Sequence, residues 1–129
     1  MNSPYKPENY NSVSPYLVVD GAGQTIAFLA AVFGAEEIRR FPDGSGKLMH
    51  AEVRLDDTVI MLADAVPDWP AAPAHVHVYV ANVDATYERA LAAGAASVQE
   101  PLARAGEEDK RGGVQDPGGT TWWIATRMG

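Results

Sequence analysis

The 129-residue sequence contains no cysteine. Disulfide bonds and thiolate metal ligands are therefore excluded. Long apolar runs are missing as well, because no stretch approaches the ~20 apolar residues that a membrane-spanning helix needs. The first residues, MNSPYKPENYNSVSP, lack the apolar core of a secretory signal peptide. These absences predict a soluble, cytoplasmic protein.

Positive charge is scarce: ten Lys and Arg residues stand against 17 Asp and Glu residues, which gives a net charge of -7 at pH 7. This balance disfavours nucleic acids and anionic membranes as partners, and it is compatible with a cationic ligand. The length fits a single domain that buries roughly two-thirds of its unfolded surface.

The chain reads as two similar units, which begin with SVSPYLVVDGAGQTIAFLAAVFGAEEIRRF and AHVHVYVANVDATYERALAAGAASVQEPL. LAAVFGA at 29–35 aligns with RALAAGA at 89–95 at an offset of 60 residues. Each unit has a β-rich run, a turn, an amphipathic helix and a Gly-Ala pair. Such a repeat predicts two copies of one structural module.

The helices are expected at about 22–33 and 84–93, where apolar residues recur with helical spacing. Each is followed by a glycine, the residue that most readily takes the left-handed conformation at a helix end. Asn82 or Asp84 is expected to cap the second helix. Both modules therefore contain one helix between their first and second strands.

Two hairpins follow the helices. GKLMHAEVRLDDTVIMLAD is expected to turn at Asp56-Asp57, and RGGVQDPGGTTWWIATR at 116–119, where proline and glycine favour a turn. The segment DAVPDWPAAPA contains three prolines and predicts a stiff, extended linker. The fold class is thus α+β, with two βαβββ modules in one compact domain. The predicted parts are an N-terminal tail at 1–12, module 1 at 13–64, a linker at 65–73 and module 2 at 74–127.

Polar side chains alternate on two of the expected strands. Alternate residues of a strand share a face, so His75, His77 and Tyr79 are expected on one face of their strand. His50 and Glu52 alternate in the same way in MHAE. Either group is expected to line a pocket or to supply part of a metal site.

This order of motifs resembles the vicinal oxygen chelate superfamily, which includes glyoxalase I, extradiol dioxygenases and bleomycin-resistance proteins, and within it the PhnB-like branch. The segments that carry the resemblance are PYLVVDGAGQTIAFLAAVFGAEE, GKLMHAEVRLDDTVIMLAD, VDATYERALAAGA and DKRGGVQDPGGTTWW. The resemblance implies a cupped mixed sheet with a concave trough, and a homodimer whose pockets use both chains. It does not determine the function, because one fold hosts many activities.

The resemblance also implies metal ligands on the first and last strands of each module. In this sequence the four positions fall on His75, near Val13, on Met61 or Ala63, and on Trp123 or Trp122. Only His75 suits a divalent ion such as zinc, iron, manganese or nickel. The metal site is therefore expected to be lost, and no cofactor is expected. An alternative set of ligands would be His50, Glu52, His75 and His77.

Three functions stay open on this basis. The leading hypothesis is a protein that binds a small molecule in the trough without a metal. The rival is an enzyme, either a metal-dependent lyase or dioxygenase, or a metal-free one that uses His50 or His75 as a general base. The third is a purely structural dimer.

Trp122 and Trp123 are neighbours on one expected strand, so their side chains are expected on opposite faces of the sheet. One is expected to face the trough, where a ligand could stack on it, and the other to pack under a helix. Arg111, with Asp109, resembles a charged pair of the family, although an exposed ion pair is the alternative. The predicted ligand-binding residues are His50, Glu52, Met61, His75, His77, Tyr79, Arg111, Trp122 and Trp123.

Overall fold

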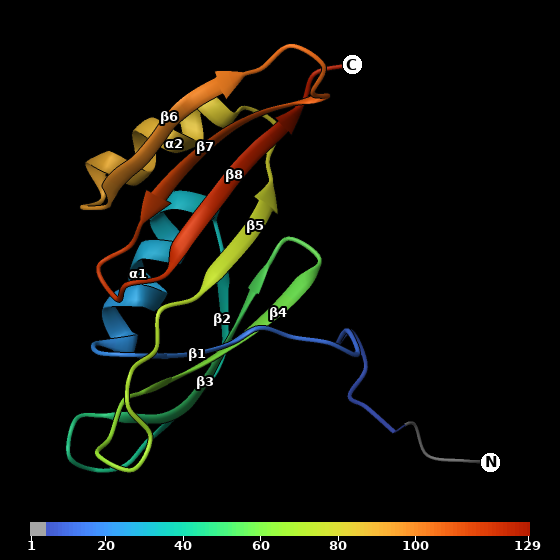
Figure 1. The fold of residues 1–129 in the computed structure, drawn as a ribbon. Coiled ribbons are helices and arrows are strands. Elements are labelled where there is room, and N and C mark those ends of the chain that lie inside the picture. Colours follow the sequence, from blue (N-terminus) through green and yellow to red (C-terminus); the bar gives the residue numbers. More distant parts are fainter. Residues whose placement is uncertain (1–4) are drawn as a thin grey trace.

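The computed structural model describes residues 5–129, so the first four residues of the predicted N-terminal tail lie outside the described part. Module 1 consists of β1 (Tyr16–Val19), α1 (Ala22–Phe33), β2 (Glu36–Pro42), β3 (Leu48–Leu55) and β4 (Thr58–Asp64). Module 2 consists of β5 (His75–Tyr79), α2 (Val83–Ala92), β6 (Ala96–Ala103), β7 (Asp109–Gln115) and β8 (Thr121–Arg127). The two βαβββ modules and the α+β class are confirmed (Figure 1).

Each module forms its own four-stranded mixed sheet, in the order β1-β4-β3-β2 and β5-β8-β7-β6. The first strand of each module pairs in parallel with the last strand, and the other pairs are antiparallel. The cupped sheet that the resemblance implied is thus divided into two sheets within this chain. Short connections join the antiparallel neighbours inside each module. A proline-containing segment separates β4 from β5, and no local turn joins these two strands.

The helices lie close to their predicted positions. α1 matches the expected range, and α2 begins and ends one residue earlier than expected. Asn82, and not Asp84, caps α2, because its side chain accepts a hydrogen bond from the backbone N–H of Ala85 at 3.1 Å. Gly34 ends α1 in the left-handed conformation, with a φ of 69°. No helix within residues 5–129 is long and apolar enough to cross a membrane.

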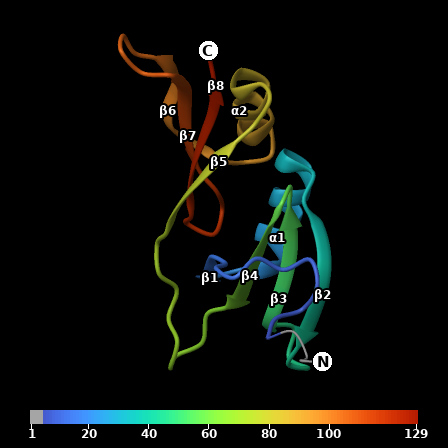
Figure 2. The ribbon, with the colours of Figure 1, turned by 90° about the vertical axis from the view of Figure 1, so that its right-hand side faces the viewer.

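α1 packs on one face of the first sheet and α2 on one face of the second, and the helices contact each other (Figures 1 and 2). One apolar cluster joins the two modules, and it includes Leu29, Val32, Trp122 and Ile124, which are almost fully buried. The ring of Phe33 from α1 lies 5.4 Å from that of Trp122. The helix-covered faces therefore form the core, and the opposite faces carry the polar side chains.

Asp116 organises the β7–β8 turn and the tryptophan beside it. One carboxylate oxygen accepts hydrogen bonds from the backbone N–H groups of Gly118 and Thr120, at 2.8 and 3.1 Å. The other oxygen accepts a hydrogen bond from Trp122 Nε1 at 2.8 Å. Trp122 is thereby held under the helices, and Trp123 points to the opposite face of the sheet.

Candidate functional site

The polar faces of the two sheets carry a matched row of residues. In module 1, β-pairing aligns Tyr16, Met61, Glu52 and Arg39 across the sheet. In module 2, the corresponding row is His77, Trp123, Gly113 and Gln99. The same sheet positions thus carry different chemistry in the two modules. We call these surfaces the module 1 face, on the side of Glu52, and the module 2 face, on the side of Trp123.

Trp123 and His75 form a flat aromatic platform on the module 2 face. Their rings are nearly parallel, with an angle of 9° and centroids 6.2 Å apart. Trp123 Nε1 donates a hydrogen bond to His75 Nδ1 at 3.1 Å. Gly113 lies beneath the indole, because a Cβ atom on this residue would come within 2.6 Å of Trp123 Cζ3. The glycine therefore allows the indole to lie against the sheet.

A charged network continues from this platform along the module 2 face. Arg111 Nε donates to His77 Nε2 at 3.3 Å, and Arg111 also contacts the Asp109 carboxylate at 3.3 Å. Tyr79 donates its hydroxyl proton to the same carboxylate at 2.7 Å. Burial and the Arg111 charge lower the pKa of His77, against the opposing effect of Asp109. His77 is therefore neutral near pH 7, with Nε2 as the acceptor.

A cavity of about 360 Å³ opens beside the platform. His77, Arg111 and Trp123 line it together with residues from β6 and the loop that follows, namely Gln99, Leu102, Arg104 and Glu107. The sequence pattern did not single out these four, because the long β6–β7 connection has no periodic signal. The high density of charged residues in this connection was the sequence feature that could have indicated a site there.

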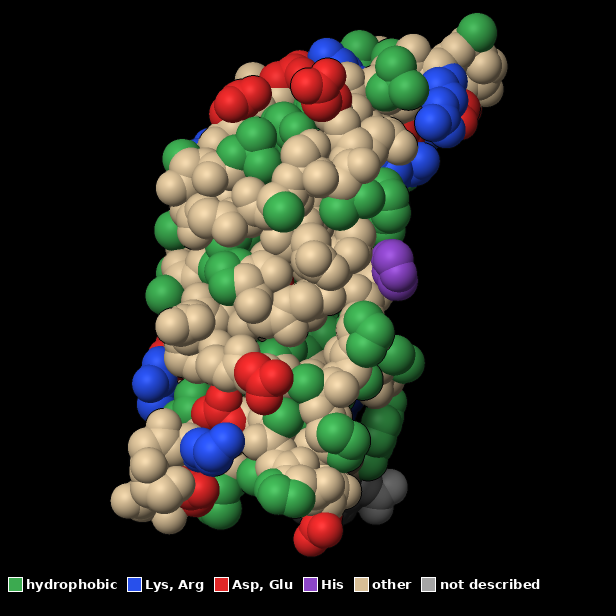
Figure 3. Space-filling view, turned by 60° about the vertical axis from the view of Figure 1, so that its left-hand side comes forward, with side chains coloured by type: hydrophobic (Ala, Val, Ile, Leu, Met, Phe, Trp, Pro, Cys, Tyr) green, Lys and Arg blue, Asp and Glu red, His purple; other side chains and the backbone are tan. Residues whose placement is uncertain are grey.

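Figure 3 shows an exposed histidine at the edge of the molecule, beside a run of hydrophobic side chains. His75, His77 and Tyr79 are all exposed, as expected for side chains that face away from the helices. The imidazole groups of His75 and His77 and the phenol of Tyr79 are therefore accessible on the module 2 face.

The module 1 face has a buried carboxylate at its centre. Glu52 is only 6% exposed. It accepts hydrogen bonds from the Tyr10 hydroxyl and from His50 Nε2, the latter at 2.8 Å, and Arg39 lies 3.4 Å away. Burial alone would raise the pKa of Glu52, but these hydrogen bonds and the Arg39 charge outweigh burial and lower the pKa. Glu52 is therefore ionised at neutral pH.

Aromatic side chains surround this carboxylate. The Tyr16 hydroxyl lies 2.8 Å from His50 Nδ1, and the Tyr16 ring lies 5.2 Å from that of Trp69 in the linker. Phe41 lies 6.1 Å from the ring of His50. Tyr16, Phe41 and Trp69 are 40%, 44% and 47% exposed, which is unusual for large aromatic residues. The module 1 face is thus an accessible aromatic surface with a negative charge behind it.

The predicted site residues therefore fall into two groups on separate sheets. His75, His77, Tyr79, Arg111 and Trp123 lie together on the module 2 face. His50, Glu52 and Met61 lie on the module 1 face. Trp122 is fully buried and packs against Phe33, so Trp123 is the tryptophan that faces the trough side.

The residues at the inherited metal positions do not fit a divalent ion within this chain. Among residues 5–129, no three His, Asp or Glu side chains gather closely enough to hold one. Nδ1 of His75 already accepts a hydrogen bond from Trp123, and both His50 nitrogens are engaged, one by Tyr16 and one by Glu52. Val13 precedes β1 and is 83% exposed. Met61 and Trp123 offer no hard donor.

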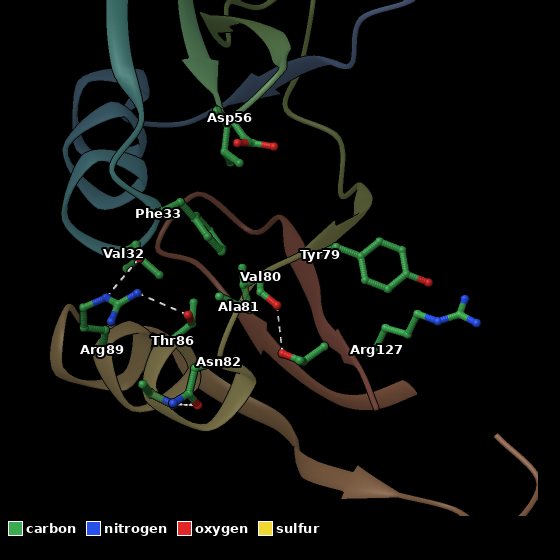
Figure 4. Close-up of a pocket in the computed structure, with 13 residues that line it drawn as sticks. Val32, Phe33, Asp56, Tyr79, Val80, Ala81, Asn82, Thr86, Arg89 and Arg127 are labelled. Atoms are coloured by element: carbon green, nitrogen blue, oxygen red, sulfur yellow. Dashed lines mark hydrogen bonds between the residues drawn. The ribbon is translucent and has the colours of Figure 1, made fainter. Parts of the chain in front are cut away.

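A cavity of about 980 Å³ lies at the seam between the modules (Figure 4). Its walls come from the end of α1, the β3–β4 turn, the start of α2 and the end of β8. Arg89 donates to the Val32 carbonyl and to Thr86 Oγ1, both at 3.1 Å, and so ties α2 to α1. Tyr79 is the predicted site residue that lines this cavity. We assign the seam a structural role.

Comparisons with known proteins agree with this architecture. Residues 10–124 match the model of the Glyoxalase/Bleomycin resistance protein/Dioxygenase superfamily. A Mycobacterium bovis protein named only as uncharacterized is 38% identical over 122 residues, which span 86% of this chain and 80% of the relative.

Two solved structures share the fold. TioX from Micromonospora sp. ML1 superposes with a TM-score of 0.75 at 22% identity, over 91% of this chain and 98% of TioX. The PhnB protein of Bacillus cereus, described as a putative 3-demethylubiquinone-9 3-methyltransferase, has a TM-score of 0.70 at 19% identity, over 90% and 99% of the two chains. The chain belongs to the glyoxalase/bleomycin resistance protein/dioxygenase superfamily.

Proposed function

We propose that this protein binds a small, planar aromatic molecule on the module 2 face, through side chains alone and without the metal of its family. The observation that supports this most is the flat pair of Trp123 and His75 beside a 360 Å³ cavity. Small-molecule sites are typically concave and largely apolar, with a few polar groups that fix orientation. Stacking on such a platform contributes about 0.5–1.5 kcal/mol beyond the area buried.

The hydrogen bonds within the module 2 face favour a ligand rich in acceptors. A neutral imidazole that accepts at one nitrogen carries its proton on the other. His75 accepts at Nδ1 and His77 at Nε2, so each presents an N–H group at its remaining nitrogen. Arg104 and Arg111 add further donors, and two carboxylates oppose them: Glu107 at the cavity wall and Asp109 in contact with Arg111. An aromatic carboxylate is the ligand class that matches these donors, although the whole chain is acidic.

A second copy of the chain is part of this proposal. Each polar face is open on one side, and the exposed aromatic residues of the module 1 face have no cover within the described chain. A homodimer that places the module 1 face of one chain opposite the module 2 face of its partner would enclose the ligand. The exposed aromatic side chains beside Glu52 would then face the donors around Arg111.

Titration calorimetry with metal chelated tests the ligand class. We expect 2-naphthoate to bind and its cationic counterpart, 2-naphthylmethylammonium, to bind at least tenfold more weakly. Trp123→Ala and Arg111→Gln should each weaken 2-naphthoate binding at least tenfold. Arg40→Gln is the matched control, because Arg40 pairs with Glu37 on the opposite side of the first sheet. Equal affinity for the two probes, or no binding of either, would refute the proposal.

A further inference from the structure

Within one chain, the buried carboxylate of Glu52 contacts Tyr10, His50 and Arg39, and none of these residues lies on the module 2 face. An ionised group removed from water is costly unless charges and hydrogen bonds compensate it. Tyr10, His50 and Arg39 supply that compensation from the N-terminal segment, β3 and β2. The result is a fixed negative charge directly behind His50.

This carboxylate determines which nitrogen of His50 carries the proton. Glu52 is ionised and accepts only, so His50 Nε2 must donate to it. In the neutral imidazole, Nδ1 then carries the lone pair, and it lies 2.8 Å from the Tyr16 hydroxyl. Tyr16 donates its single hydroxyl proton to Nδ1. The phenolic oxygen is left with a lone pair for any molecule that approaches the module 1 face.

Tyr16 is the accessible end of this chain of hydrogen bonds. Its residue is 40% exposed, whereas Glu52 is 6% exposed. Trp69 and Phe41 flank Tyr16 and His50 and form an aromatic wall beside the phenolic oxygen. A flat organic molecule on this wall would meet the Tyr16 oxygen first.

We propose that Tyr16, His50 and Glu52 form a proton relay that deprotonates an aromatic carbon acid, a molecule with a C–H bond next to a carbonyl group. The substrate C–H bond breaks, and its proton forms a new O–H bond at Tyr16. The original hydroxyl proton of Tyr16 moves to His50 Nδ1. The products are an enolate and an imidazolium ion, and the Glu52 carboxylate stabilises that ion. Tyr16 is the catalytic residue, and His50 and Glu52 are positioning residues.

The charges around the relay favour this route over a free phenolate. The ionisable groups that face His50 and its partners are Tyr10 from the N-terminal segment, Tyr16 from β1, Arg39 from β2 and Glu52 from β3. Burial and the Glu52 charge raise the pKa of Tyr16, so its hydroxyl stays protonated. Tyr16 therefore transfers a proton to His50 and does not exist as a phenolate.

The relay lies on the module 1 face and goes beyond the proposed binding function of the module 2 face. The two inferences fail separately, because the relay residues are on β1 and β3, whereas the platform is on β5 and β8. Loss of naphthoate binding says nothing about proton transfer, and the reverse also holds.

Deuterium exchange of 2-indanone, a flat aromatic ketone, tests the relay. The loss of its α-proton signals in D2O is followed by ¹H NMR, and we expect the protein to exceed free imidazole at equal concentration by about 10²-fold. Tyr16→Phe and His50→Gln should each remove this excess. Tyr5→Phe is the matched control, because Tyr5 is 87% exposed. No excess, or an excess that survives Tyr16→Phe, would overturn the relay.

A second measurement requires no substrate, and it does not depend on the activity of any variant. The ¹⁵N signals of the histidine rings in the full-length protein, assigned with His50→Gln, report the tautomer of His50 directly. In the neutral ring we expect a proton on Nε2 and none on Nδ1, and we expect the Nδ1 signal to shift in Tyr16→Phe. A protonated Nδ1 in the neutral ring would overturn the relay.

Discussion

Trp122 donates its indole proton to Asp116 at 2.8 Å, so the tryptophan at the centre of the core is tied to the turn that precedes it. Asp116 is 4% exposed and also holds two backbone N–H groups of that turn. The turn and the core are therefore one structural unit, and both depend on a single carboxylate.

Asp116→Ala should lower the free energy of unfolding by about 2–4 kcal/mol, because it leaves buried donors without partners. Urea denaturation followed by tryptophan fluorescence measures the change. Asp57→Ala is the control, since Asp57 is exposed and, among residues 5–129, its side chain accepts a hydrogen bond only from the neighbouring Thr58 hydroxyl. Equal effects of the two substitutions would contradict the role assigned to Asp116.

Gly113→Ala should displace the Trp123 indole, because the new Cβ atom would lie 2.6 Å from that ring. We expect a loss of about 1–3 kcal/mol of stability and weaker binding of 2-naphthoate. Gly23→Ala should have the opposite effect on the free energy of unfolding. This residue lies in α1 with no atom near its missing Cβ, so alanine there should stabilise the protein by up to about 1 kcal/mol.

The protein should lose stability in acid, because two partly buried carboxylates have lowered pKa values. Burial would raise the pKa of both, but hydrogen bonds outweigh burial, at Glu52 as described and at Asp64 through the N–H groups of Ala22, Leu48 and Gly21. A carboxylate with a folded-state pKa below its unfolded value contributes stability above the unfolded value, and the contribution is lost as pH falls through the folded value.

The ordinary pKa values are 4.5 for Glu52 and 3.8 for Asp64, so the midpoint of urea unfolding should begin to fall below about pH 4.5. Glu52→Gln should reduce the dependence of the unfolding midpoint on pH. Glu100→Gln, at an exposed position, should leave this dependence unchanged. A pH profile that Glu52→Gln does not alter would show that the folded protein does not lower the pKa of Glu52.

Protein purified without chelators should contain much less than one zinc, iron, manganese or nickel ion per chain. At the inherited positions, Nδ1 of His75 accepts a hydrogen bond from Trp123, and Met61 and Trp123 offer no hard donor. In the alternative set, His50 and Glu52 are hydrogen-bonded to each other. Elemental analysis by mass spectrometry measures the metal content. Stoichiometric metal that disappears in His75→Ala would require a site assembled from two chains.

Light scattering should give a solution mass of twice 13.8 kDa if the module 1 face packs on the module 2 face of a second copy. A charge in the exposed aromatic surface, as in Trp69→Asp, should shift the protein towards the monomer. Met128→Asp is the control, because Met128 is 60% exposed near the C-terminus and belongs to neither face. A monomeric wild-type protein would refute the proposed assembly.

Local patterns in the sequence were sufficient for most of the fold. The helical spacing around Ile26 and Leu29 predicted α1, and the Asp56-Asp57 pair predicted a turn that places Glu52 opposite Met61, as found. The alternation of Trp122 and Trp123 predicted that one would be buried. All of these features depend on residues close together in the chain.

Contacts between distant residues could not be predicted in this way. Tyr10 reaches Glu52 across 42 positions, and Arg111 reaches His77 across 34. Neither pair has a spacing that marks it, because the sheet topology alone brings the residues together. The division into two sheets was also unforeseen, since a repeated pattern specifies each module but not the relation between them.

The tie from Arg89 to the Val32 carbonyl means that neither half of this duplicated chain is complete. α1 has no basic residue in its own last turn, and the guanidinium that meets one of its terminal carbonyl groups belongs to α2. A fragment cut in the proline-containing linker would expose Phe33 on one side and Trp122 on the other. The two modules are thus interdependent, and each serves as part of the scaffold for the other.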